Sequence, residues 1–247
     1  MHKIAICGNH RSGTNSLYDF FVDLGVTSVH EPFHPRKWKE PYDEKYDWDA
    51  DLAGRTAISD HIVEEVAKLY DDHQAMKHLW NHIPDQVNRW LIQWLVSHGV
   101  KVIHIERANR LAQAISWKLA GETGMWGTDD PGAPEEYLEK CASIHIDVEA
   151  LKQRMTEIEV QECDYKQLLA EGYLLSVKHE QLYSAAPPQV EDTVRKMLQF
   201  TELDPAAGQL RSAMECFHPS HKQTTTSVYA LIPNIAEIEA TFGVKLT

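Results

Sequence analysis

Short apolar runs alternate along the chain with longer stretches in which apolar residues recur every three or four positions. The short runs predict buried strands over residues 4–7, 26–29, 75–80, 100–105 and 173–179. The periodic stretches predict amphipathic helices over residues 17–24, 60–70, 84–95, 110–119, 134–158 and 188–200. Strands that alternate with helices predict an α/β fold, in which a mainly parallel sheet is flanked by helices on both faces.

No internal repeat or low-complexity linker interrupts this pattern. We therefore predict a single domain over residues 1–247, with a less regular C-terminal segment over residues 217–247. In parallel sheets, ligands bind at the carboxyl ends of the strands. Four polar sites directly follow predicted strands and are expected to converge at that edge: residues 8–16, residues 30–34, Asn81 and Arg107.

The composition limits the partners. A formal net charge of −13 argues against a nucleic acid or an anionic membrane as the main partner, because either would need a strongly basic face. The four cysteines have no paired spacing, which favours reduced thiols. The chain contains neither a signal-peptide pattern nor an apolar run long enough to span a membrane, so we predict a cytoplasmic protein.

The first predicted strand opens into the polar loop Gly8-Asn9-His10-Arg11-Ser12-Gly13-Thr14-Asn15-Ser16. A strand, a tight loop and a helix start together aim backbone N–H groups and the positive end of a helix dipole at an anion. The side chains of Arg11, Ser12, Thr14 and Ser16 can add further donors. The loop therefore predicts a phosphate-binding site, and an ordinary strand–turn–helix is the alternative.

The loop departs from the Walker A motif G-x-x-x-x-G-K-[ST] at the two positions that matter most. With Gly8 and Gly13 as the two glycines, Thr14 occupies the lysine position and Asn15 occupies the position of the hydroxyl that binds Mg²⁺. The pattern indicates a nucleotide phosphate without the usual chemistry of a Mg²⁺-bound triphosphate.

A second candidate pair follows the predicted strand 100–105. Arg107 comes at the end of this strand, and Asn109 can cap the helix that follows. Ser116 lies in that helix, nine residues after Arg107. The fork of donors on an arginine suits an oxyanion, so Arg107 is well placed to bind a phosphate. A structural ion pair is the alternative for Arg107 taken alone.

Together, the two segments resemble the sulfotransferases that use 3′-phosphoadenosine 5′-phosphosulfate (PAPS). In that family a first-loop motif [KR]-S-G-[ST]-[TN] binds the 5′-phosphosulfate, and residues 11–15 match it. A later arginine and a serine nine residues after it bind the 3′-phosphate, and Arg107 and Ser116 match both types and spacing. The resemblance implies a three-layer P-loop-type fold. It also implies a PAPS site made of Arg11, Ser12, Gly13, Thr14, Asn15, Ser16, Arg107 and Ser116.

Three further segments resemble the bacterial branch that includes trehalose 2-sulfotransferases, so the resemblance extends to about residue 185. They are residues 31–33 (E-P-F), residues 77–81 (K-H-L-W-N) and residues 177–182 (V-K-H-E-Q-L). That branch places its catalytic glutamate three residues after the first glutamate, and here the position is His34. We predict His34 as general base, with Glu31 as the substitute, and Arg11 as a fixed positive charge beside the transferred group.

Residues 30–34 also spell H-E-x-x-H, a zinc-protease pattern. That motif needs a continuous helix with both histidines on one face, and Pro32 interrupts the segment just after a predicted strand. No convincing third ligand follows in the sequence. His78 and His82 have a permissive spacing, but their strand and loop contexts favour ordinary polar histidines. We therefore predict no metal site.

The resulting hypothesis is a sulfotransferase that moves a sulfuryl group from PAPS to a hydroxyl or amine of a small molecule or sugar and releases 3′,5′-adenosine bisphosphate. The acidic composition favours a neutral acceptor. Loops 35–54 and 122–134 and the C-terminal tail are expected to shape the acceptor site. The alternatives are a P-loop nucleotide kinase or hydrolase with a degenerate loop, and a non-catalytic protein that binds adenosine bisphosphate. The sequence carries no signal for the oligomeric state.

Overall fold

The computed structural model describes residues 3–34, 60–126, 135–168, 172–183, 187–218 and 226–246. The predicted loop 35–54 lies outside these residues, as do residues 127–134 of the second loop and most of the tail segment 222–226.

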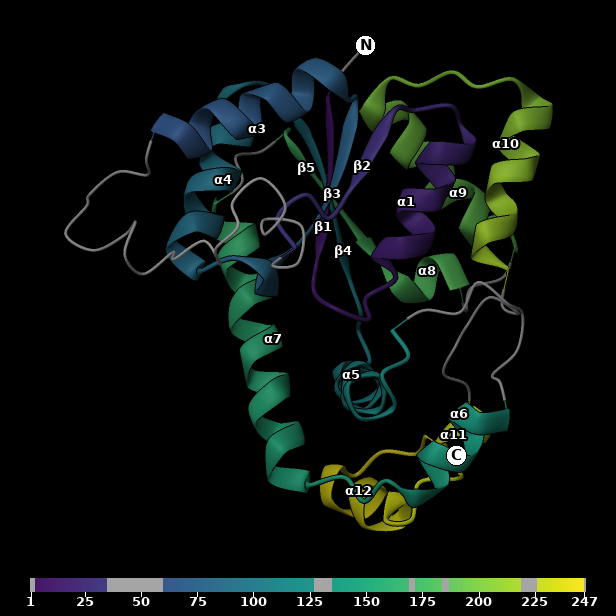
Figure 1. Ribbon diagram of the computed structural model, residues 1–247. Helices are drawn as coiled ribbons and strands as arrows, with labels where there is room; N and C mark the ends of the chain where they lie inside the picture. The colour runs from purple at the N-terminus through teal and green to yellow at the C-terminus, as the bar shows by residue number, and fades with distance from the viewer. Residues whose placement is uncertain are drawn as a thin grey trace.

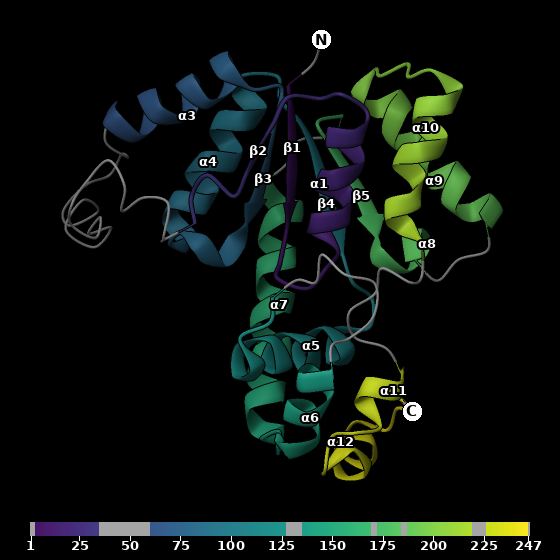
Figure 2. The same ribbon diagram turned by 45° about the vertical axis from the view of Figure 1, so that its right-hand side comes forward.

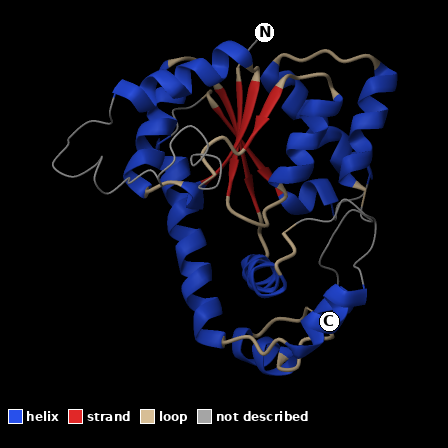
Figure 3. Ribbon diagram, in the orientation of Figure 1, coloured by secondary structure: helices blue, strands red, loops and turns tan. Residues whose placement is uncertain are grey.

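Five parallel strands form one sheet in the order β2-β3-β1-β4-β5 (Figures 1 and 3). The strands are β1 (Ile4–Gly8), β2 (Ser28–His30), β3 (Ala75–Leu79), β4 (Lys101–Glu106) and β5 (Leu174–Lys178). All five were predicted. The first strand lies at the centre of the sheet, so the loop that follows it emerges in the middle of the carboxyl edge.

Helices cover both faces of the sheet, because successive residues of a central strand point to opposite sides. Ala5 and Cys7 of β1 pack with α3 (Asp60–Asp72), α4 (Asp85–Ser97) and the C-terminal end of α7 (Val148–Leu168). Ile4 and Ile6 pack on the other side with α1 (Thr14–Asp23), α9 (Pro187–Thr201) and α10 (Ala207–Met214). The predicted α/β architecture is confirmed.

A second group of helices lies beyond the carboxyl ends of the strands, at the bottom of Figures 1 and 2. It comprises α5 (Arg110–Thr123), α6 (Glu135–Ser143), the N-terminal end of α7, α11 (Thr226–Tyr229) and α12 (Ile235–Phe242). These helices share an apolar cluster that includes Leu119, Tyr137 and Ile238, all nearly inaccessible to solvent. The carboxyl edge of the sheet therefore faces this helical layer. The single-domain division stays a prediction.

Several boundaries differ from the predicted ones. The helical stretch 134–158, whose pattern is compatible with one long helix or two, forms two helices, α6 and α7, and α7 continues beyond the predicted end to residue 168. Its buried apolar residues Leu151, Ile158 and Tyr165 recur only every seven positions, which leaves a weak periodic signal. After β3, residues 80–82 form a 3₁₀ turn, η1 (Trp80–His82), where the prediction continued the strand to residue 80.

Three short elements complete the fold. They are α8 (His179–Tyr183), which follows β5 directly, α10, which the sequence did not predict, and η2 (Glu215–Phe217). The eight residues of α10 present only Ala213 as a fully buried side chain. A helix this short, with one small buried residue, has no amphipathic pattern that a sequence window can detect.

The predicted cap of α5 is present: the Asn109 side chain accepts a hydrogen bond from the backbone N–H of Ala112 at 2.9 Å. Replacing Asn109 with alanine removes this acceptor and should lower the free energy of unfolding by about 1 kcal/mol. Asn109→Ser keeps a capping oxygen and should stay within about 0.5 kcal/mol of the wild type. Urea unfolding followed by circular dichroism measures both variants, and equal stability of the alanine and serine variants would contradict this role.

Candidate active site

The loop after β1 is a tight turn packed against β4. The Ser12 hydroxyl donates to the Asn9 carbonyl at 2.7 Å, and the Ser12 backbone N–H donates to the same oxygen at 3.3 Å. At Gly8, a Cβ would lie 2.8 Å from the Ile105 carbonyl oxygen and from Ser12 Oγ. No other residue fits this position, so the first glycine of the motif serves close packing.

Gly13 connects the turn to α1 in the left-handed conformation, with a φ of 99°, and its Cβ would press on His179 and Tyr183 at 3.1 Å. No side chain caps α1, and its first turn has no acidic residue. The leading N–H groups of a helix have no intrahelical acceptor. They point, together with the positive end of the helix dipole, toward the carboxyl edge of the sheet. The predicted arrangement of strand, loop and helix start is confirmed.

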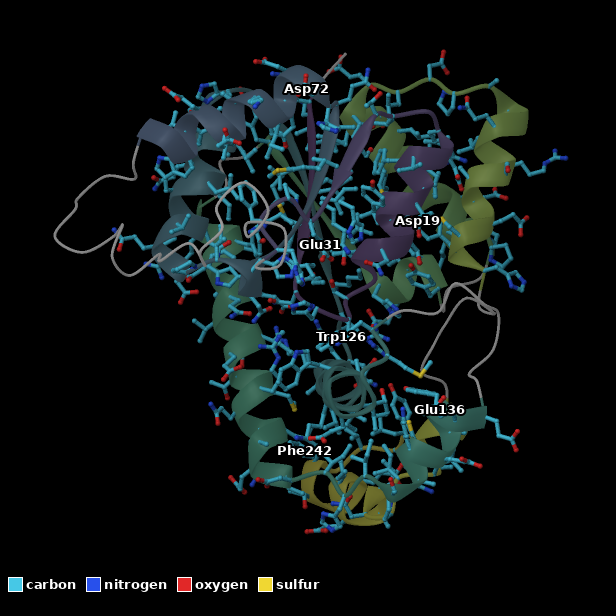
Figure 4. All side chains as sticks on the ribbon, in the orientation of Figure 1. Asp19, Glu31, Asp72, Trp126, Glu136 and Phe242 are labelled. Carbon is cyan, nitrogen blue, oxygen red and sulfur yellow. The ribbon has the colours of Figure 1, made fainter. Side chains whose placement is uncertain are left out.

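Arg11 also has a positive φ, 65°, which is rare for a residue with a side chain. Its Nε donates to Ser116 Oγ at 2.9 Å, across 105 residues of sequence. A second nitrogen donates to the carbonyl of Trp126, which is labelled in Figure 4 between the sheet and the helical layer. Burial lowers the pKa of Arg11, and the nearby Arg107 adds to this effect. Ser116 is itself 2% exposed, so this contact is internal.

Arg107 contacts the same loop from the end of β4. One terminal nitrogen lies 3.3 Å from the Arg11 carbonyl oxygen, and the other lies 3.5 Å from the hydroxyl of Tyr229 in α11. Its Nε is buried without a hydrogen-bond partner among the described residues. Arg107 and Ser116, which the sequence paired by spacing, are therefore brought together through Arg11.

Lys77 was not predicted as a site residue. It lies in β3, is 1% exposed, and donates to the Asn15 side chain and to Glu31 Oε1, the latter at 2.5 Å. Its Nζ also lies 3.1 Å from His30 Nε2. The available signal was a lysine in the middle of a predicted buried strand, because a buried ammonium needs a paired partner. Lys77 places a positive charge beside the loop that lacks the Walker lysine.

The Glu31 carboxylate, which directly follows β2, forms an ion pair with the Lys77 ammonium. Glu31 has a φ of 47°, and its backbone N–H donates to the Lys77 carbonyl at 3.1 Å, which fixes the turn. Burial opposes ionisation of Glu31, but the ammonium of Lys77 outweighs it and lowers the pKa of the carboxyl to about 2. The His34 backbone N–H donates to the Glu31 carbonyl at 3.1 Å, so both predicted base candidates belong to one turn.

Histidine rings surround this turn. The rings of His34 and His10 lie 4.8 and 5.3 Å from the ring of His82, measured between centroids. Burial lowers the pKa of His82 to about 2 and that of His10 to about 4, so both rings are neutral near pH 7. Neither was predicted as a site residue. Residues 31–34 form a turn, so the continuous helix that a zinc protease requires is not formed.

The loop, the two arginines and the buried lysine bring hydrogen-bond donors and positive charge together at the carboxyl edge of an α/β sheet, an arrangement that suits an anionic ligand. The family model of the Stf0 sulphotransferases matches residues 4–215, and the chain belongs to this family. It is therefore an enzyme that transfers a sulfuryl group. Comparison with curated proteins gives no match.

Solved structures of similar fold are bacterial sulfotransferases. The sulfotransferase domain from the curacin biosynthetic pathway has a TM-score of 0.50 at 11% identity, over 100% of this chain and 99% of that chain. A sulfotransferase from Alicyclobacillus acidocaldarius has a TM-score of 0.46 at 15% identity, over 99% and 97%. At 11% identity the likeness to the curacin-pathway domain shows the fold alone. Within the described ranges, no helix combines the length and apolarity needed to cross a membrane.

The Lys77–Glu31 pair predicts a pH-dependent contribution to stability. A carboxyl whose pKa falls from 4.5 unfolded to about 2 folded stabilises the protein above pH 4.5, and this stabilisation is lost as the pH falls toward 2. The difference in unfolding free energy between wild type and Glu31→Gln should therefore shrink by about 2 kcal/mol from pH 6 to pH 3. Urea titrations at the two pH values measure this. The variant Glu122→Gln, at an exposed position, is the control. If the unfolding free energies of the wild type and of Glu31→Gln changed equally between the two pH values, the pairing would be contradicted.

Proposed function

We propose that the sulfuryl donor is PAPS and that the acceptor is a hydroxyl or amine of a neutral sugar or small molecule. One observation carries the proposal: Arg107 and Ser116, from the end of β4 and from α5, both contact Arg11 of the loop. These contacts bring the guanidinium groups of Arg11 and Arg107 together beside the uncapped start of α1, so that they form one cationic region. Two separate anionic groups on one nucleotide need such a region.

The two ends of PAPS would be bound by different residues. The backbone N–H groups of residues 12–16 and the guanidinium of Arg11 would hold the 5′-phosphosulfate, as the family motif implies. Arg107 and Ser116 would hold the 3′-phosphate. On binding, Arg11 and Ser116 would exchange their mutual hydrogen bond for bonds to the ligand. Thr14 and Asn15 replace the groups that bind Mg²⁺-triphosphate, which supports a donor that needs no such ion.

Lys77 would supply the charge that the loop sequence lacks. Its ammonium contacts Asn15, so it lies beside the start of α1, where the transferred group would be bound. When the bond between sulfur and the bridging phosphate oxygen breaks, negative charge grows on that oxygen. A buried cation already held in place stabilises this charge without reorganisation. Arg11 would act on the same group from the other side.

The acceptor would attack sulfur in line. A bond forms between the acceptor oxygen or nitrogen and sulfur, the bond to the bridging phosphate oxygen breaks, and 3′,5′-adenosine bisphosphate leaves. His34 would take the acceptor's proton, because a carboxylate with a pKa of about 2, such as Glu31, is a poor base near neutrality. Glu31 would instead keep Lys77 in position.

The setting of the reaction follows from charge and thiols. The net charge of −13 disfavours a polyanionic acceptor. Cys7, Cys141, Cys163 and Cys216 are all free thiols, which supports the cytoplasm as the compartment.

Nucleotide titration separates PAPS-type recognition from a degenerate kinase. Isothermal calorimetry should show tighter binding of adenosine 3′,5′-bisphosphate than of Mg²⁺-ATP. Arg107→Met should weaken binding of the bisphosphate by about 10- to 100-fold, the loss expected for a charged hydrogen bond. Its affinity for adenosine 5′-monophosphate should stay within about threefold of the wild-type value. Preferential binding of Mg²⁺-ATP would overturn the donor assignment.

Removal of the proposed base should affect chemistry and spare binding. With ³⁵S-labelled PAPS and an acceptor selected from a panel of neutral sugars and alcohols, His34→Ala should lower kcat by about 10²- to 10⁴-fold. Its affinity for adenosine bisphosphate should stay at the wild-type value. The exposed His98, which follows α4, provides the control variant His98→Ala. Full turnover by His34→Ala would remove His34 from the mechanism.

A further inference from the structure

The acceptor side of the site holds more ligand atoms than a proton transfer needs. One ligand atom each from Glu31, His34 and His82 lies within 4.8 Å of the other two. Glu31, near the centre of the molecule in Figure 4, and His34 belong to the turn after β2. His82 ends η1, after β3. Because β2 and β3 are neighbours in the sheet, their carboxyl ends bring the three residues together.

His82 is the unexplained member of this group. Its side chain is 4% exposed, and neither ring nitrogen has a hydrogen-bond partner among the described residues. Its neighbour His78 differs, because Nε2 of that ring pairs with Asn88 Oδ1 at 2.7 Å. A buried polar group without a partner destabilises a fold unless something else binds it. Either ring nitrogen of His82 can therefore face a ligand without giving up a hydrogen bond to the described residues.

Among the described residues, one oxygen of Glu31 accepts no hydrogen bond, and this oxygen faces the His82 ring. Its Oε1 accepts from Lys77, whereas its Oε2 lies 3.9 Å from His82 Nε2. A carboxylate that receives a hydrogen bond on one oxygen and binds a metal through the other is a common outer-shell arrangement. Lys77 would hold the carboxylate in place and, as a nearby cation, would also moderate the affinity for a positive ion.

We propose that Glu31, His34 and His82 form a binding site for a divalent transition-metal ion, with Zn²⁺ as the best match. Two imidazoles and one carboxylate are a common zinc ligand set that leaves a fourth position open. Mg²⁺ and Ca²⁺ prefer oxygen ligands and fit less well. Tetrahedral zinc places ligand atoms about 3.4 Å apart, so ligand atoms that now lie within 4.8 Å of one another need to approach by up to about 1.4 Å.

This ligand set differs from the H-E-x-x-H pattern of the sequence. That pattern would use His30 and His34 on one helix, but His30 Nε2 lies against Lys77 Nζ at 3.1 Å. The third ligand comes instead from His82, far away in the sequence. The expectation of no metal site rested on the missing helix, on the lack of a third ligand in the sequence and on the interpretation of His82 as an ordinary polar histidine. The pairing of β2 with β3 places His82 beside Glu31 and His34.

The site has a consequence that rests on the proposed function. A metal ion on His34 and Glu31 takes the lone pair that would remove the acceptor's proton. Zn²⁺ should therefore inhibit sulfuryl transfer reversibly, and a chelator should restore it.

The test titrates metal-free full-length protein with ZnCl₂ by calorimetry, and with CoCl₂ by visible absorption, without donor or acceptor. We expect one ion per chain and the intense Co²⁺ bands of a tetrahedral site. Glu31→Gln and His82→Leu should each weaken Zn²⁺ binding more than about tenfold. His98→Ala, which removes an exposed histidine, should bind as the wild type does.

Circular dichroism checks that the variants fold. If His82→Leu does not fold, the Glu31→Gln variant alone decides the test. No saturable binding by the wild type, or wild-type affinity in the folded ligand variants, would overturn the site. Turnover that Zn²⁺ leaves unchanged or raises would overturn the inhibition. Calorimetry with adenosine 3′,5′-bisphosphate reports on the proposed function separately, since zinc binding without bisphosphate binding would leave the metal site standing alone.

Discussion

The buried ammonium of Lys77 is the interaction on which the rest of the site depends. It connects the phosphate loop, through Asn15, with the turn after β2, through Glu31. A charge this deeply buried destabilises the fold unless it is paired and fully hydrogen-bonded, so the loop and the turn must stay in place for the fold to remain stable. The sheet order makes this possible, because β3 lies between β2 and β1. One side chain on the middle strand therefore reaches both neighbours.

Backbone strain lies at the same two places. Among the described residues, only Arg11, Glu31 and Glu202 combine a side chain with a positive φ. Two of the three belong to the site, and each is fixed by long-range contacts: Arg11 to α5, and Glu31 to β3. Strained residues persist where the surrounding structure determines them, and they concentrate at functional sites. The loop after β1 and the turn after β2 thus each have one strained residue, and Lys77 contacts both segments.

The sequence predicted the parts of the site that are local in the chain. The loop glycines, the Asn109 cap and the Arg107–Ser116 spacing each depend on a few adjacent residues or on one helix, and the structure contains all three features. Lys77 and His82 could not be placed in the same way, because their roles depend on which strands are neighbours, and local periodicity carries no information on strand order. The same reason explains why His34 and Glu31 stayed alternatives in the sequence: the pKa of Glu31 is lowered chiefly by Lys77, which lies on a neighbouring strand.

The most direct test compares sulfuryl transfer from ³⁵S-labelled PAPS by the Glu31→Gln variant and by the Glu31→Gln, Lys77→Met double variant. The shared Glu31→Gln background avoids an unpaired buried carboxylate. If the Lys77 ammonium stabilises the leaving oxygen, loss of it should lower kcat by about 10²- to 10³-fold, as for other preorganised donors. Affinity for adenosine 3′,5′-bisphosphate should change less than about threefold. Equal turnover by the two variants would contradict the account.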